Sequence, residues 1–303
     1  MKWSVIILLA IFATKPAWAV ATGNSFQTTQ PTNVQVPYWT IGWPKSGTTG
    51  WNYVGQAAGA SGIYLGNGWV LTAAHVGIGA FILNGVTYQA VAGSGHYLTV
   101  KNADGSTSTP DLILYQLATS PPLSPLTISQ NAPVPLSQNQ TGSSVVMIGY
   151  GGGSGESWGY DSVDYINYYP VTLGSYNSND FIAFFGTYYS GAVGNSLSTT
   201  NNSSLVGGDS GGGDFIYNPS TQMWELAGIN EVIGSGTVNN QKVSISGFVQ
   251  LSSYATQIDA IVNASIPSDS PTLPIPGLLI MSCLLVIAAS RKIGQRAFPT
   301  SRF

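Results

Sequence analysis

Gly207-Gly208-Asp209-Ser210-Gly211-Gly212 places one serine among glycines, directly after an aspartate. Glycines allow positive φ angles and a close approach of substrate, so this stretch can form a tight turn that exposes the Ser210 hydroxyl. Such a turn also leaves main-chain N–H groups free to point at a developing oxyanion. A second stretch, Thr72-Ala73-Ala74-His75, supplies a candidate base. Together the two stretches predict a serine hydrolase.

The order of these residues along the chain narrows the class of hydrolase. Residues 208–212 also fit the G-x-S-x-G turn of α/β-hydrolases, in which the histidine follows the serine. Here the two histidines, His75 and His96, both precede Ser210. Subtilisins need an aspartate before the histidine, and no Asp or Glu occurs before Asp104. The order His, Asp, Ser therefore remains.

The acid of this order is expected between His75 and Ser210. Asp111 opens an apolar run to Leu117 that is typical of a buried strand, where packing can hold a carboxylate and partly shield it from water. Asp104 precedes Gly105 in a polar stretch that is typical of a turn. We therefore favour Asp111 over Asp104.

Three stretches as a set resemble the signature blocks of chymotrypsin/trypsin-like serine proteases (peptidase S1 type). They are Trp69-Val-Leu-Thr-Ala-Ala-His75, Asp111-Leu-Ile-Leu-Tyr-Gln-Leu117 and Gly208-Asp-Ser-Gly-Gly212. Smaller likenesses at Gly149-Tyr-Gly151, Gly228-Ile229 and Gly247-Phe-Val249 extend the resemblance over about residues 50–263. The resemblance implies an all-β fold of two six-stranded antiparallel β-barrels, with the triad in the cleft between them. It also implies a C-terminal helix, which the apolar spacing between Ser252 and Val262 predicts independently.

The roles of the site residues follow from this template. Ser210 would attack the scissile carbonyl, His75 would take its proton, and Asp111 would orient the imidazole. The main-chain N–H groups of Gly208 and Ser210 would form the oxyanion hole.

Specificity and activation are also read from the resemblance. It places Ser204 at the base of the primary specificity pocket and Gly247 at its wall, and a neutral base implies an uncharged apolar or aromatic residue before the scissile bond. In many members a new N-terminal Ile or Val pairs with the aspartate before the serine, here Asp209. Because no Ile-Val-Gly-Gly-like start is present, we expect another donor to hold Asp209.

The first residues are typical of a secretory signal peptide, residues 1–19. Lys2 precedes an apolar run that is too short to span a bilayer, and Ala17-Trp18-Ala19 is a small-x-small cleavage site. Cleavage after Ala19 would export a protein that begins at Val20. We expect an N-terminal segment at 20–49 and a protease domain at 50–265.

The C-terminal end resembles the bacterial sorting tails of the PEP-CTERM type. A proline-rich linker at 266–277 precedes an apolar helix and a basic tail at 278–303. A plain C-terminal anchor is the alternative. In either case we expect the tail to meet the membrane or the sorting machinery, with its basic end on the cytoplasmic side.

Composition excludes several classes of partner. Residues 20–290 hold three lysines, no arginine and all twelve acidic residues, which makes the exported part a poor binder of nucleic acid. Cys283 is the sole cysteine, and with two histidines it gives no metal-site spacing. Gly151-Gly152-Gly153 lacks the Lys-Ser/Thr of a phosphate loop and is interpreted as a flexible connection. No cofactor is expected.

The sequence thus predicts an exported, bacterial serine endopeptidase with a cysteine-free protease domain, which acts through an acyl-enzyme on protein or peptide substrates. We expect it outside the cell or at the cell surface, where the C-terminal helix could anchor it transiently. The alternative from another class is a catalytically weak or inactive surface binding or adhesion module. Tyrosine-rich stretches at 164–170 and 184–189 could serve recognition in such a module, or form strands of the second barrel. Esterase activity would use the same groups.

Overall fold

The computed structural model describes residues 20–264, apart from short gaps at 23–24, 102–104, 106, 136–141, 154, 164, 174–175, 190–202 and 239–240. The chain divides into two compact units, residues 1–263 and 264–303, and the description below concerns the first. The predicted signal peptide, the proline-rich linker, the C-terminal tail with Cys283, and Asp104 lie outside the described residues. Within the described part, the structure has no helix that is both long and apolar enough to cross a membrane.

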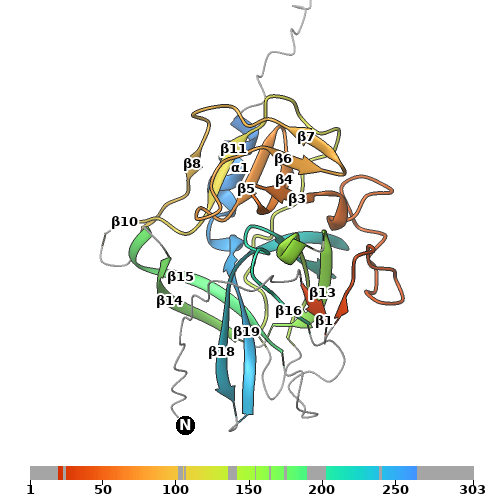
Figure 1. The fold of residues 1–303 in the computed structure, drawn as a ribbon, viewed down its shortest axis with the longest axis vertical. Helices are drawn as coiled ribbons and strands as arrows, with labels where there is room; N and C mark the ends of the chain where they lie inside the picture. Colours follow the sequence, from red (N-terminus) through yellow and green to blue (C-terminus); the bar gives the residue numbers. More distant parts are fainter. Residues whose placement is uncertain are drawn as a thin grey trace, which may run out of the picture. The chain divides into compact units, whose positions relative to one another are not determined.

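The first large sheet contains seven antiparallel strands in the order β7-β6-β3-β4-β5-β11-β8 (Figure 1). Two of its hairpin turns are Asn67-Gly68 and Asn84-Gly85, and all four residues have positive φ angles. Such turns match the right-handed twist of the strands that they join, so the Asn-Gly pairs favour these hairpins. The strands are β3 (Val54–Ala57), β4 (Ala60–Gly66), β5 (Trp69–Thr72), β6 (Phe81–Leu83), β7 (Val86–Tyr88), β8 (His96–Tyr97) and β11 (Ile113–Gln116).

The second large sheet also contains seven antiparallel strands, in the order β13-β12-β17-β18-β19-β15-β14. The two sheets and one C-terminal helix confirm the predicted trypsin-like double β-barrel fold, although each sheet has seven strands among the described residues rather than six. The tyrosine-rich stretches fall in β14 and β15 and are therefore strands. The strands are β12 (Ser144–Gly149), β13 (Ser157–Ser162), β14 (Tyr165–Leu173), β15 (Tyr176–Tyr189), β17 (Gly213–Asn218), β18 (Met223–Val238) and β19 (Gln241–Gln250).

Two small sheets and three 3-10 turns complete the described elements. The first small sheet has the order β16-β1-β2, so the N-terminal β1 pairs with the strand just before the serine turn. Its strands are β1 (Ala21–Thr22), β2 (Ser25–Phe26) and β16 (Ser203–Ser204), and the second small sheet joins β9 (Val100–Lys101) to β10 (Thr107–Ser108). The 3-10 turns are η1 (Gly50–Asn52), η2 (Gly151–Gly153) and η3 (Leu251–Ser253).

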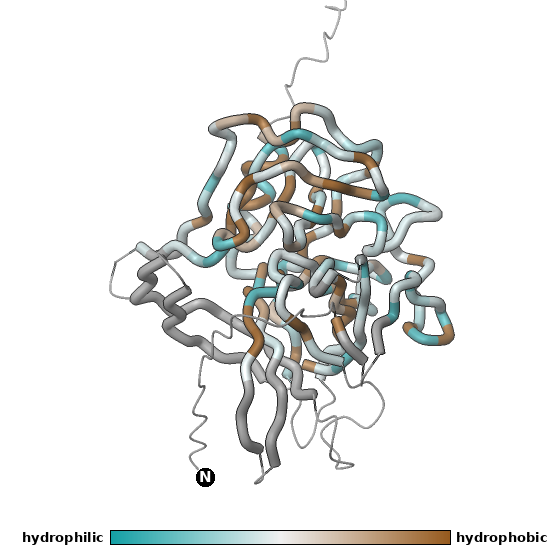
Figure 2. Tube along the Cα trace, in the orientation of Figure 1, coloured by the Kyte–Doolittle hydropathy of each residue, from teal (hydrophilic) through white to brown (hydrophobic). Residues whose placement is uncertain are grey.

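One apolar core runs through both large sheets. It includes Ile63 and Leu71 of the first sheet together with Ile148, Phe215 and Leu226 of the second, all essentially buried. Apolar positions recur along strands of both sheets in Figure 2. Burial of this surface is the main favourable contribution to folding, and it explains why the domain needs no disulfide.

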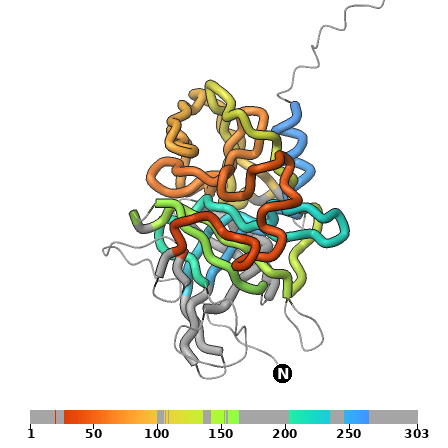
Figure 3. Tube along the Cα trace, turned by 90° about the vertical axis from the view of Figure 1, so that its right-hand side faces the viewer, coloured from red at the N-terminus to blue at the C-terminus, as the bar shows by residue number. Residues whose placement is uncertain are grey.

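The helix α1 (Ala255–Ala264) packs on the first sheet (Figures 1 and 3). Ile258 and Val262 are buried, and the side chain of Gln257 accepts the main-chain N–H of Thr99 at 3.0 Å. The expected helix is confirmed, but it begins three residues later than Ser252 because residues 251–253 form a 3-10 turn.

Candidate active site

His75 and Asp111 meet at the ends of two neighbouring strands. His75 follows β5, and Asp111 precedes β11, which pairs antiparallel with β5. One carboxylate oxygen of Asp111 accepts the main-chain N–H of His75 at 2.8 Å, and the other contacts Nδ1 of its ring. Asp111 is 2% exposed, whereas a third of the His75 side chain is open to solvent. The carboxylate therefore anchors the histidine by its backbone and its ring, which leaves Nε2 for a third group.

Ser210 lies in a turn that only glycine can form at two positions. Gly208 has a φ of +97° and Gly211 a φ of +84°, where a side chain is strained. A Cβ on Gly211 would also collide with Thr72 Oγ1 and with the carbonyl oxygen of Ser61. Because Thr72 is the last residue of β5, this close packing brings the serine turn against the strand that leads to His75.

The main-chain N–H groups of this turn divide into two sets. Those of Asp209, Gly211 and Gly212 donate to the carbonyls of Val206, Asn230 and Asp209, respectively, at 2.8–3.2 Å. Those of Gly208 and Ser210 have no acceptor among the hydrogen bonds of the described residues. The two free donors are those expected to form an oxyanion hole, where a substrate oxygen would be their partner.

Ser61, a residue that the sequence did not single out, connects the serine turn to both sheets. It is fully buried on β4, and its main-chain N–H donates to the carbonyl of Ser210 at 2.9 Å. Its hydroxyl donates to the carbonyl of Gly208 at 3.3 Å and accepts the N–H of Tyr150 at 2.8 Å. A serine in an apolar strand carries no sequence signal for this role, because its partners are distant along the chain.

The Ser210 hydroxyl is not bonded to His75 among the contacts of the described residues. It donates instead to the main-chain carbonyl of Glu231, on β18, at 3.5 Å. Glu231 is 5% exposed, and both of its carboxyl oxygens have no hydrogen-bond partner in the described structure. Burial, together with the negative charge of Asp111, raises the pKa of Glu231 well above its ordinary value. Nothing in the sequence pattern singles out Glu231 either.

The Asp209 carboxylate lies against Gly149, at the end of β12 in the second sheet. It is 1% exposed, and its carboxylate accepts the main-chain N–H groups of Val206 at 2.9 Å and Gly151 at 3.0 Å, and also that of Val20. Burial raises the pKa of Asp209 to about 7, and these three N–H groups act in the opposite direction. Asp209 is therefore held by main-chain donors.

The glycine run 151–153, which the sequence analysis interprets as a flexible connection, forms the 3-10 turn η2 between β12 and β13. A Cβ on Gly151 would come within 2.7 Å of Asp209 Oδ1, so glycine lets the backbone approach the carboxylate closely enough to donate to it.

Comparison of the sequence with protein-family models finds a match to trypsin over residues 44–258. The chain belongs to the trypsin family. No curated protein matches it.

Solved structures of proteases resemble this trypsin-family chain at low sequence identity. An inactive form of the Rv3671c protease is 16% identical with a TM-score of 0.44, over 69% of this chain and 89% of that one. A serine-to-alanine mutant of Rv3671c from M. tuberculosis H37Rv, also inactive, is 15% identical with a TM-score of 0.46, over 80% and 99% of the two chains. The HtrA-type protease AlgW with a decapeptide is 15% identical with a TM-score of 0.38, over 68% and 52%.

The two expected specificity residues of this trypsin-family protein lie on neighbouring segments. Ser204 is 7% exposed and pairs with Ala21 of β1, while Gly247 lies on β19 opposite Val232. Their sequence neighbours form a hydrogen bond, in which the main-chain N–H of Leu205 donates to the hydroxyl of Ser246 at 2.9 Å. The geometry thus brings the two segments together, and their role in specificity stays a prediction.

His96 lies apart from the residues proposed for catalysis. It belongs to the short strand β8 rather than to a loop, and its ring packs edge-on against Trp69 with 5.3 Å between centroids. Among the described residues, the structure has no group of three or more His, Cys, Asp or Glu that could hold a metal ion.

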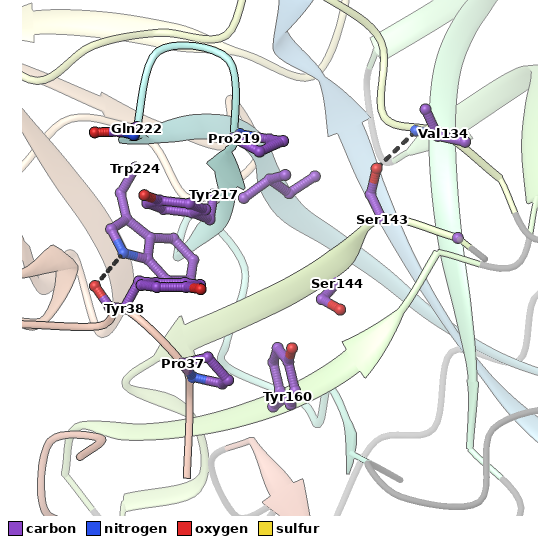
Figure 4. Close-up of a pocket in the computed structure, with 12 residues that line it drawn as sticks. Pro37, Tyr38, Val134, Ser143, Ser144, Tyr160, Tyr217, Pro219, Gln222 and Trp224 are labelled. Carbon is purple, nitrogen blue, oxygen red and sulfur yellow. Dashed lines mark hydrogen bonds between the residues drawn. The ribbon is translucent and has the colours of Figure 1, made fainter. Parts of the chain in front are cut away.

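A separate pocket of about 640 Å³ lies where the N-terminal segment meets the second sheet (Figure 4). The rings of Tyr38 and Tyr217 stack in its wall with 4.9 Å between centroids, and Trp224 Nε1 donates to the carbonyl of Tyr38 at 2.9 Å. Its lining contains none of the residues proposed for catalysis or specificity. The lining residues are Pro37, Tyr38, Val134, Gly142, Ser143, Ser144, Tyr160, Ile216, Tyr217, Pro219, Gln222 and Trp224.

Proposed function

We propose that this protein is an exported serine endopeptidase in which His75, Asp111 and Ser210 form the catalytic triad. The single observation that carries the proposal is the double anchoring of His75 by buried Asp111. The two free N–H groups of the serine turn support it.

The proposed reaction uses each of these groups in turn. The Ser210 hydroxyl attacks the scissile carbonyl as His75 Nε2 takes its proton, and Asp111 stabilises the imidazolium that forms. The carbonyl oxygen becomes an oxyanion that accepts the N–H groups of Gly208 and Ser210. His75 then protonates the leaving amine, and water hydrolyses the acyl-enzyme by the same steps in reverse. A rotation of the Ser210 hydroxyl away from the Glu231 carbonyl would precede the attack.

The substrate class follows from the expected specificity pocket. With neutral Ser204 at its base and Gly247 at its wall, we propose cleavage after an uncharged apolar or aromatic residue. A peptide library would show the preference directly, and a preference for cleavage after Arg would contradict it. Parallel assays with ester substrates measure any esterase activity of the same groups.

The proposed export step also concerns Asp209. Removal of residues 1–19 would convert the buried N–H of Val20 into an α-amino group beside this carboxylate. A charged amine would then be the cationic partner that Asp209 otherwise lacks among the described residues. We propose that signal-peptide removal itself completes the site, and that the C-terminal tail directs the exported protein to the cell surface.

Ser210→Ala in the full chain tests the catalytic proposal. We expect a folded, exported protein whose kcat is lower by about a million-fold. The two histidines provide a matched pair, since His75→Gln should lose most activity and His96→Gln should keep it. Undiminished peptide hydrolysis by Ser210→Ala would rule out the mechanism.

A catalytically weak binding module is the second candidate, and one observation favours it. The Ser210 hydroxyl donates to the Glu231 carbonyl instead of to His75. A fluorophosphonate probe separates the two candidates, because it labels only a serine that a base activates. A folded wild-type protein that takes up no probe would favour the binding module.

A further inference from the structure

Glu231 occupies a position in β18 where the strand pairing is interrupted. In the ladder between β18 and β19, Asn230 pairs with Phe248 and Val232 pairs with Gly247, so Glu231 has no partner across the strands. Such a bulge redirects the side chain of its extra residue, and bulges are frequent next to active sites. The backbone at this residue is thus arranged differently from the rest of the strand.

The residue is linked to the proposed triad through its backbone. Its main-chain carbonyl accepts the Ser210 hydroxyl at 3.5 Å. The negative charge of Asp111 also adds to burial in raising the pKa of its side chain. Asp111 in turn bonds to His75. The charge of Asp209, on the serine turn, raises the pKa of a different buried acid, Asp214. Among the residues that the structure describes, no lysine or arginine forms an ion pair with Glu231 or with another acid.

A charged Glu231 would be costly in this position. An ionised carboxylate that is buried without a partner costs several kcal/mol, and a second negative charge nearby adds to the cost. The neutral acid avoids this cost and can donate one hydrogen bond.

We propose that Glu231 is a positioning residue that carries its proton at neutral pH and keeps Asp111 as the single negative charge beside His75. The inference rests on the proposed function. In this arrangement the side chain of Glu231 acts through Asp111, and its main-chain carbonyl acts on the Ser210 hydroxyl. Loss of its proton at alkaline pH would place two negative charges together and disturb the triad.

The chain offers a matched control on the same strand. Glu225 is also buried on β18, at 8% exposure, but its carboxylate accepts the side-chain amide of Asn218 at 2.8 Å. Glu225→Gln therefore makes the same chemical change without touching the triad. Glu231→Gln keeps the size and the neutrality of the proposed acid, and Glu231→Leu removes its donor.

The first measurement is the NMR titration of His75 in the full chain, with His96→Gln used to assign the two histidine signals. If Glu231 is neutral, Glu231→Gln should shift the titration midpoint of His75 by less than about 0.3 pH units, as should Glu225→Gln. If Glu231 is charged, its replacement should lower the midpoint by about one unit or more, and that result would overturn the proposal. This titration does not require the protein to hydrolyse anything.

The second measurement is kcat/KM against pH. Wild-type protein and Glu225→Gln should show an ionisation above neutrality that is missing from Glu231→Gln, whose rate at pH 7 should fall about threefold. Glu231→Leu should lose about tenfold, mainly in kcat, which corresponds to one hydrogen bond. An alkaline limb that is identical in Glu231→Gln and wild type would refute the positioning role. If the wild-type protein neither hydrolyses peptides nor takes up the fluorophosphonate probe, the proposed function is wrong. The NMR titration of His75 would still show whether Glu231 carries a proton.

Discussion

Asp111 and Asp209 are both buried next to the serine turn, but their partners differ in kind. Asp111 holds an imidazole, a side chain that can gain and lose a proton. Asp209 holds only main-chain N–H groups, which cannot change their charge. The pair of Asp111 and His75 can therefore take part in proton transfer, whereas Asp209 and its main-chain donors can only fix the backbone conformation of the turn.

Each of these aspartates also has a second carboxyl nearby that lacks partners. Glu231 lies near Asp111, and Asp214 lies near Asp209, and in both cases burial and the neighbouring charge raise the pKa of the second group. None of the carboxyl oxygens of Glu231 and Asp214 has a hydrogen-bond partner in the described structure. Each region thus satisfies one carboxylate and favours the neutral form of the other.

Among the variants that test this comparison of the two aspartates, the largest effect is expected from Asp111→Asn. The amide keeps the size of the side chain but cannot hold His75 in the tautomer that accepts a proton at Nε2, so kcat should fall about 10⁴-fold. The melting temperature should change little, because the fold does not depend on this charge. Steady-state kinetics and thermal unfolding of the full chain check both expectations. A tenfold loss or less would mean that Asp111 is not the acid of the triad.

A smaller effect, mainly on stability, is expected when one residue is added before Val20 in the processed protein. A protein that begins at Val20 would place an α-ammonium group beside Asp209, and one extra alanine at position 19 would move that charge away. The extended protein should be less stable at pH 8 by about 3 kcal/mol, the order of a broken buried ion pair, and less active. Thermal unfolding and probe labelling compare the two proteins.

The pH dependence of the same pair of proteins gives a second test. Without the ammonium group, Asp209 has a pKa of about 7 in the folded state and about 3.8 when unfolded. The folded state then binds more protons between these values, so the free energy of unfolding should fall as pH rises from about 4 to 7. In the protein that begins at Val20 this decline should vanish, with stability lost only above the pKa of the amine. The difference should disappear in Asp209→Asn, and a difference that persists there would exclude the proposed pairing.

The smallest effect is expected from Ser61→Ala, at the point where the two regions meet. The change removes the acceptor of the Tyr150 N–H and the donor to the Gly208 carbonyl, at a cost of about 1–3 kcal/mol in stability. The oxyanion donors should lose some order, which would lower kcat about tenfold with KM little changed. Ser94→Ala is the control, because it removes a half-buried hydroxyl that likewise donates to a carbonyl, that of Val91 at 2.7 Å, and accepts a main-chain N–H, that of Gln116 at 3.0 Å, but lies away from the serine turn. Equal kinetics in the two variants would show that Ser61 only stabilises the fold.

The sequence by itself determined the features that depend on neighbouring residues. The glycines around Ser210 predict a tight turn, the Asn-Gly pairs favour hairpins, and the order of histidine, aspartate and serine restricts the class of hydrolase. The resemblance of three short stretches to the trypsin family implied the family and the double-barrel fold, and the family match and the structure confirm them.

Only the tertiary structure decided which distant groups share a site. Ser61, Glu231 and Val20 stand in stretches without any catalytic pattern, and each reaches the serine turn through the packing of strands that are remote in sequence. A turn is set by the backbone conformations of a few consecutive residues. The partners of a buried carboxyl group depend on which strands pack together in the core. Burial makes these partners decisive, because a carboxylate without a partner cannot stay charged in the protein interior.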